Sequence, residues 1–236
     1  MIKNYNDFIA ALLETGFSGA VGGKDDGVFG LFRYGWGAEE ETGIQWHTDN
    51  PDTDPWQWRI RVFNERDDIA YSKVFFRKAG YITKEWYPYF LAVRRPPCAR
   101  RDVMTFEDEY ASGTLSHYSK RIYDAIADHG RLSLNEIKRV AGFKREDTSK
   151  VEGALTELQM KMYLTICEIG YKVSQKGEKY GFSYAVFSTA ESFWSDDVFD
   201  KAENIDANEA VATIKERIHT LNPSAHEKKI IKFIRG

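Results

Sequence analysis

The chain has 236 residues, of which 42% are hydrophobic and 14% aromatic, and its net charge is −3. This composition allows a dense core in one large or two modest domains, and the charge argues against a general polyanion binder. Cys98 and Cys167 lie far apart without a CxxC motif, so we expect neither a disulfide framework nor a zinc ribbon. The expectations are a reducing compartment, no membrane span and a cytoplasmic location.

The N-terminal part predicts helices separated by short strands. A first helix is expected after Asn6, with Gly16 as its stop. Residues 17–47 are glycine-rich with interleaved aromatics, which is typical of short strands and hairpins. Two more helix starts are expected, one at Asp54, because proline follows it, and one at Thr83.

The stretch RRPPCARR, residues 94–101, predicts an extended link because its two prolines break a helix. It divides the chain into an aromatic-rich α+β domain, 1–105, and a second domain, 106–236. If the second domain binds DNA, the arginines of the link are expected on its flank as phosphate clamps. They are Arg94, Arg95, Arg100 and Arg101.

The second domain predicts three helices followed by a β-hairpin. Ser133 with Glu136, and Ser149 with Glu152, match the capping-box pattern that opens a helix. After the third helix, YLTICEIGYKVS and FSYAVFST are rich in β-branched and aromatic residues and flank a glycine-containing turn. The expected elements are helices near 116–129, 133–141 and 147–162, and a hairpin that pairs 163–173 with 181–189.

Helix, helix, helix and hairpin is the order of a winged helix. The last 45 residues add two helices, one capped by Asp206 and stopped by Asn222-Pro223, and a short terminal one. The fold class predicted is therefore α+β: a winged-helix C-terminal half joined to an aromatic-rich α+β N-terminal half.

Double-stranded DNA is the expected partner of such a unit, because the third helix of a helix-turn-helix places its N-terminal residues in the major groove. Residues 116–190 carry 12 basic and 9 acidic side chains, a modest excess. Glu146 and Asp147 oppose it, and the alternative for each lysine is a solvated surface residue. The candidate contacts are Lys144, Arg145, Ser149 and Lys150 in the helix, and Lys172, Lys176 and Lys179 in the hairpin.

Catalytic signatures are scarce. The chain has no P-loop, dinucleotide glycine fingerprint, HExxH or GxSxG motif, and its five histidines show no ligand spacing, so we expect no cofactor and no metal. Tryptophans and arginines cluster in the N-terminal half. They suit stacking of an unpaired base, with ordinary core packing as the alternative.

Three stretches resemble the AlkZ-related group, which is similar to the winged-helix DNA glycosylases of the AlkZ type. They are residues 106–142, residues 151–166, and the upstream DPWQWRIRV with YSKVFFRKAGYITKEWYPYFLAVRR. The resemblance covers most of the chain from about residue 45 onward. It implies a winged-helix architecture, with tandem winged helices as a variant, and a role on DNA, with glycosylase chemistry on damaged or alkylated bases as the activity.

AlkZ-type glycosylases are associated with a glutamine–apolar–glutamine motif that positions the attacking water. Gln45-Trp46-His47 matches it with a histidine in the last position, and Gln159-Met160-Lys161 matches it with a lysine there. A glutamine and an imidazole that flank an aromatic ring could orient a water. The resemblance thus makes Gln45 and His47 the catalytic candidates.

Three functions stay open on the sequence. The first is a DNA-binding protein with residual or altered glycosylase chemistry, or with a retained fold and lost chemistry. The second is a noncatalytic module that senses a ligand or binds a protein through its aromatic half. The third is a transcription regulator, which would normally form a dimer.

Overall fold

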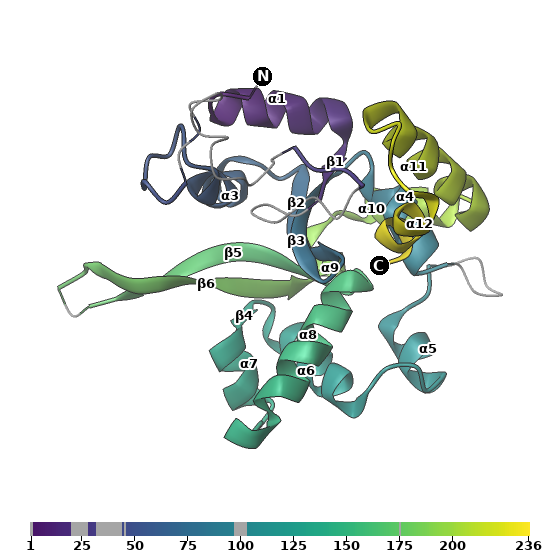
Figure 1. The fold of residues 1–236 in the computed structure, drawn as a ribbon. Coiled ribbons are helices and arrows are strands. Elements are labelled where there is room, and N and C mark those ends of the chain that lie inside the picture. The colour runs from purple at the N-terminus through teal and green to yellow at the C-terminus, as the bar shows by residue number, and fades with distance from the viewer. Residues whose placement is uncertain (1, 20–27, 32–43, 45, 97–102, 175) are drawn as a thin grey trace.

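One antiparallel sheet forms the middle of the molecule (Figure 1). A computed structural model of the protein describes residues 2–19, 28–31, 44, 46–96, 103–174 and 176–236. Within these ranges six strands lie in the order β1-β3-β2-β5-β6-β4. The strands are β1 (Phe17–Ser18), β2 (Ile69–Phe75), β3 (Lys78–Thr83), β4 (Leu132–Ser133), β5 (Leu164–Val173) and β6 (Lys179–Thr189).

The sheet takes strands from both sides of the expected boundary near residue 105. β2 pairs antiparallel with β5, with Tyr71 opposite Ile166. β5 and β6 form the long hairpin that extends to the left in Figure 1, and β4 pairs with the outer side of β6. The α+β fold class and the predicted hairpin are confirmed.

Three helices of the N-terminal half test the predicted starts: α1 (Tyr5–Thr15), α3 (Pro55–Glu65) and α4 (Tyr87–Arg94). Asp54 caps α3 as expected, because its carboxylate accepts the N–H of Trp56 at 2.8 Å. α1 begins two residues earlier than predicted, with Asn4 as its cap. The predicted start at Thr83 is wrong: Thr83 ends β3 opposite Ile69, and α4 begins only at Tyr87.

The three helices expected between residues 116 and 162 lie where the sequence predicts them. They are α6 (His117–His129), α7 (Leu134–Val140) and α8 (Thr148–Met160), with the short helices α5 (Phe106–Ala111) and η1 (Arg145–Asp147) before α6 and α8. The capping box at Ser133 is confirmed, since Glu136 accepts the N–H of Ser133 at 2.8 Å. The second box at Ser149 is wrong, because α8 already starts at Thr148 and Asp147 caps the preceding turn instead.

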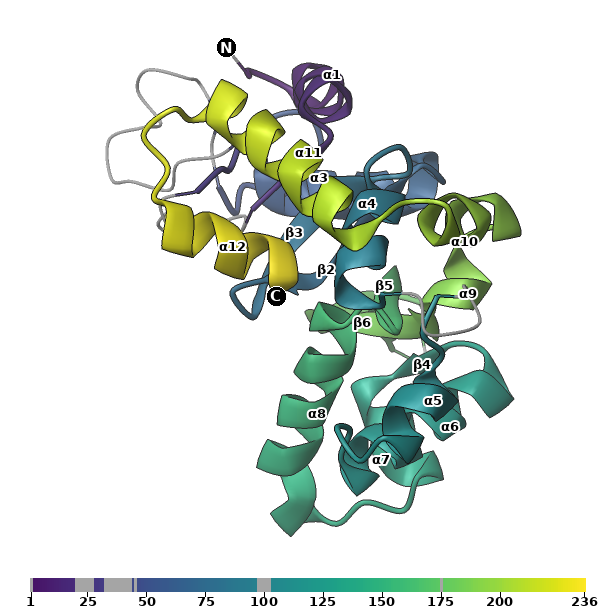
Figure 2. The ribbon, with the colours of Figure 1, turned by 90° about the vertical axis from the view of Figure 1, so that its right-hand side faces the viewer.

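The C-terminal helices return to the N-terminal half. α9 (Ala190–Phe193) and α10 (Asp196–Glu203) were not predicted, whereas α11 (Ala207–Leu221) and α12 (Glu227–Arg235) were. Figure 2 shows α11 and α12 beside α4, on which α10 also packs. The C-terminal helices therefore pack on α4 and complete the core of the N-terminal half.

Two hydrophobic clusters hold the layers together. One joins α1 and α3 to α6 and α8, and includes Phe8, Trp58 and Leu158; the other joins α4 to the C-terminal helices, and includes Phe90 and Phe233. Trp58 is fully buried and stacks on Phe8 with ring centroids 5.4 Å apart, so the core alternative holds for this tryptophan.

No helix among the described residues is long and apolar enough to cross a membrane. No group of three or more His, Cys, Asp or Glu side chains within the described ranges is arranged to hold a metal ion.

Candidate nucleic-acid interface

The start of α8 presents the predicted contact residues to solvent. Lys144 and Arg145 are exposed in the turn before the helix, and Ser149 and Lys150 are exposed in its first turn. In Figure 2 this end of α8 is the lowest part of the molecule and lies far from α12. A charged partner can therefore approach these four side chains from outside.

Asp147 fixes that turn. Its carboxylate accepts the N–H of Lys144 at 2.9 Å and the hydroxyl of Tyr118, on α6, at 2.9 Å. These two bonds, the one from Lys144 first, hold the pKa of Asp147 below its usual value. Asp147, one of the two acidic residues expected to oppose phosphate binding, thus accepts hydrogen bonds within the protein. The other, Glu146, remains exposed beside Arg145.

The hairpin carries the other predicted lysines. Lys172 lies on β5 opposite Tyr180 of β6, and Lys176 lies at the tip; both are exposed. Figure 1 shows the tip reaching well beyond the helices. The side chain of Lys179 is outside the described part of the structure.

Arg94 is not part of an exposed link. It ends α4, is buried, and donates hydrogen bonds to four carbonyl oxygens: Val74 (2.8 Å), Met160 (2.8 Å), Phe233 (2.9 Å) and Ile234 (2.9 Å). Burial lowers its pKa to about 9, so the guanidinium stays charged at pH 7. The guanidinium of Arg94 therefore binds backbone carbonyls of the protein itself.

Arg95 is buried as well. It donates to the carbonyl of Met104 at 2.8 Å and forms an ion pair with Glu191 at 2.7 Å. The expectation of an extended, exposed segment is therefore wrong at Arg94 and Arg95, because the sequence cannot show that carbonyls from distant elements surround them. Arg100 and Arg101 lie outside the described residues.

Of the catalytic candidates, Gln45 lies outside the described residues and His47 is exposed in the loop before α3. His47 has a φ of 60°, a left-handed conformation that is uncommon for a residue other than glycine. The buried Asp54 holds the loop in this shape by accepting the N–H groups of Thr48 (3.0 Å) and Asp49 (3.2 Å). One carboxylate thus caps α3 and orders the loop.

His47 stands next to an exposed aromatic–cation stack. Its ring centroid lies 5.3 Å from that of Trp56, which is 39% exposed, and the guanidinium of Arg59 lies 3.5 Å from the centroid of Trp56. Arg59 also donates to Ser183 Oγ on β6 at 3.1 Å. The imidazole is therefore placed beside a flat surface on which a base could stack.

Gln159, the first residue of the other partial motif, has a structural role. It is buried, its Oε1 accepts from Ser72 Oγ at 3.0 Å and from the N–H of Lys73 at 3.1 Å, and its Nε2 donates to Leu155 at 3.0 Å. The amide joins the end of α8 to β2 and is not accessible to a substrate.

Sequence reasoning missed a groove beside α8. It has a volume of about 680 Å³ and runs from Tyr118 and Lys150 to Arg235 at the end of α12. Arg77, from the turn between β2 and β3, and Lys161 also line it. These residues are spread over more than 150 positions of the chain, so no local pattern could have indicated the groove.

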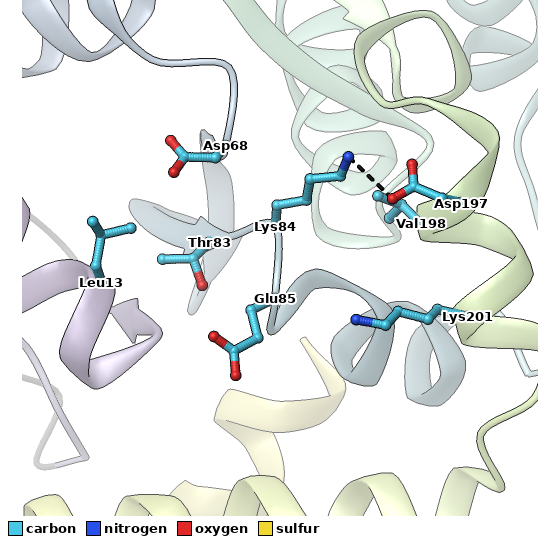
Figure 3. Close-up of a pocket in the computed structure, with 8 residues that line it drawn as sticks. All are labelled: Leu13, Asp68, Thr83, Lys84, Glu85, Asp197, Val198 and Lys201. Carbon is cyan, nitrogen blue, oxygen red and sulfur yellow. Dashed lines mark ion pairs between the residues drawn. The ribbon is translucent and has the colours of Figure 1, made fainter.

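A second hollow, of about 410 Å³, has mixed charge (Figure 3). Lys84 forms an ion pair with Asp197 at 3.1 Å across it, and Glu85 and Lys201 extend from opposite sides. Three carboxylates and two ammonium groups line this hollow, so it shows no preference for a polyanion.

Fold and surface define an α+β protein in which helices α6, α7 and α8 pack beside a sheet that includes the β5–β6 hairpin, with exposed cations at the start of α8. The chain belongs to the AlkZ-related family, whose family model matches residues 2–235. The resemblance to this family is thereby confirmed over nearly the whole chain. No curated protein and no solved structure matches the chain.

Proposed function

We propose that this protein is a winged-helix protein that binds double-stranded DNA through the start of α8 and the β5–β6 hairpin. The observation that carries the proposal is the order α6, β4, α7, α8, β5, β6, in which β4 pairs with β6 and β6 with β5. In a winged helix α8 is the recognition helix and β5–β6 the wing.

The exposed cations support this assignment. Lys144, Arg145 and Lys150 surround the start of α8, where a recognition helix contacts bases and phosphates. Lys172 and Lys176 lie on the hairpin that would reach the flanking backbone. Membership of a family named for its relation to AlkZ supports a role in DNA repair, with base excision as the reaction class.

A salt titration of binding tests the proposal. Affinity for a labelled duplex, with and without alkylated bases, is measured by fluorescence anisotropy from low to physiological salt. The wild type should bind with a steep salt dependence, since each phosphate contact contributes about 0.9 to the slope. Lys144→Ala/Arg145→Ala should lower that slope by about 1.8 if both residues contact phosphate.

The matched control is Lys228→Ala/Lys229→Ala, which removes two exposed charges from α12, a helix that lies far from the start of α8 in Figure 2. It should leave the slope unchanged. A parallel variant, Arg100→Ala/Arg101→Ala, tests the remaining arginines of the expected link. Absence of any duplex binding at low salt would refute the proposal and favour the noncatalytic ligand-sensing or protein-binding alternative.

A further inference from the structure

The groove beside α8 carries positive charge that the described residues do not neutralise. Arg77, Lys150 and Arg235 line it and are exposed. Within the described ranges none of the three forms an ion pair, whereas Glu157 is the one acidic side chain among those that line the groove. Such a surface attracts an anion that extends along the groove.

The shape of the floor suits close approach by a flexible chain. Gly153, in the middle of α8, has open space where a side chain would begin, since an added Cβ would meet no atom within 4 Å. Ala154 and Met160 continue the floor with apolar surface. Small residues at an exposed helix face leave room for the backbone of a ligand.

The turn that carries Arg77 is conformationally strained. Phe76 and Arg77 join β2 to β3 with φ angles of 51° and 63°, a two-residue turn that ordinarily favours asparagine and glycine. Phe76 packs on Phe233 of α12, with ring centroids 6.1 Å apart. The turn and the packing of Phe76 thus place Arg77 in the lining of the groove, and backbone strain of this kind is commonly kept where it serves binding.

An aromatic ring lies at the other end. Tyr118 lines the groove and stacks on Phe143 at 5.7 Å, while the ammonium of Lys150 lies 5.4 Å from the centroid of the Tyr118 ring. A positively charged groove with an aromatic ring is the usual combination for unpaired nucleic acid, in which phosphates meet cations and bases stack. An acidic peptide would use the cations alone.

We infer that this groove binds the sugar–phosphate backbone of a single DNA strand that is continuous with the duplex at the start of α8. A volume of about 680 Å³ is the size of a small-ligand pocket and cannot hold a duplex. Lys150 belongs to both surfaces, so a strand could pass from one to the other. The inference rests on the proposed function for the choice of a nucleic acid.

The experiment compares a short labelled oligothymidylate with the duplex used above. Arg77→Ala/Arg235→Ala should lower the salt slope for the single strand by about 1.4, at about 0.7 for each contact, and weaken its binding. Duplex binding should change far less. The Lys228→Ala/Lys229→Ala control removes the same charge from α12 outside the groove and should leave both probes unaffected.

A second variant blocks the groove without altering charge. Gly153→Leu should weaken single-strand binding while the salt slope for any remaining binding stays at the wild-type value. Its thermal midpoint should not fall, because leucine has the higher helix propensity and the site is open. The thermal midpoint of Gly153→Leu thus shows whether the variant that is used in the binding assay is folded.

Wild-type affinity and slope for the oligothymidylate in both Arg77→Ala/Arg235→Ala and Gly153→Leu would overturn the inference. Displacement of the oligothymidylate by polyglutamate of equal charge, at equal concentration, would also overturn it and assign the groove to an acidic peptide. Lys144→Ala/Arg145→Ala separates the two proposals. It should weaken duplex binding, whereas the groove variants should still weaken single-strand binding when they are combined with it.

Discussion

The guanidinium of Arg94 donates a hydrogen bond to the carbonyl oxygen of Met160 at 2.8 Å, and so joins the end of α4 to the end of α8. Three further carbonyls, from Val74, Phe233 and Ile234, accept from the same side chain. One residue thus ties the sheet, the proposed recognition helix and the C-terminal helix together, and it does so at the inner end of the groove.

Arg94→Ala should destabilise the protein by about 3–5 kcal/mol, because three buried carbonyls and one part-buried carbonyl lose a charged donor at once. Arg94→Lys should also be costly, since a single ammonium cannot reproduce the planar fork of a guanidinium. Urea unfolding followed by circular dichroism measures both. Arg139→Ala, at an exposed arginine of α7, is the control and should stay within about 0.5 kcal/mol of wild type. An equally small effect of Arg94→Ala would contradict the role assigned to this residue.

Two neighbouring positions of α8 should respond in opposite directions. Leu155 is 5% exposed, and Leu155→Ala should cost about 2–5 kcal/mol through the cavity it leaves. Gly153 faces open space, and Gly153→Ala should stabilise the helix by about 0.8–1 kcal/mol. Thermal melts of both variants check the pair. An unchanged midpoint for Leu155→Ala would show that the buried face of α8 is misassigned.

Acid should weaken the contact between α5 and the end of α8. Burial raises the pKa of Glu109, but hydrogen bonds from Lys161 and from Tyr163, the latter at 2.6 Å, outweigh burial, and the pKa lies below its usual value. The folded pKa is thus below the unfolded value of about 4.3, so this stabilisation is complete above that pH and is lost as the pH falls through the lowered pKa.

Glu109→Gln measures that contribution. Its unfolding free energy should lie below the wild-type value at pH 7, and the difference should shrink as the pH falls below about 4. Glu107→Gln, at an exposed position of the same helix, should show no such pH-dependent difference. A constant gap between Glu109→Gln and wild type from pH 7 to the acid limit would rule out the ion pair as its source.

Base excision, where this protein performs it, should depend on Gln45 or His47. Gel-based incision assays on alkylated duplexes compare wild type with Gln45→Ala and His47→Ala, and each loss should be roughly 10²-fold or more if the side chain orients the water. His129→Ala, at an exposed histidine that ends α6, is the control. Full activity in both variants would remove the assignment, and an inactive wild type would favour binding without catalysis.

Local chemistry determined most of the elements. The Ser133 capping box, the stop at Gly16 and the β-branched and aromatic strands of the hairpin act within a few residues, so the sequence alone predicts them. The errors also have local causes. Ser149 matches a cap pattern, but the η1 turn with Asp147 already leads into the helix before Ser149. Thr83 resembles a helix cap, but it pairs within the sheet as the last residue of β3.

The sequence by itself determined the family and the order of helices and strands, because these depend on apolar spacing and on capping within a few residues. Only the tertiary structure decided which cations face solvent. Arg94 and Arg95 look like surface residues in RRPPCARR, but Arg94 is buried and donates to carbonyls of Met160 and Phe233, more than 60 residues away in the sequence. Arg77 and Arg235, which are far apart in the sequence, line the same groove. Burial of a charge depends on which distant groups surround it, and that information is absent from any short stretch of sequence.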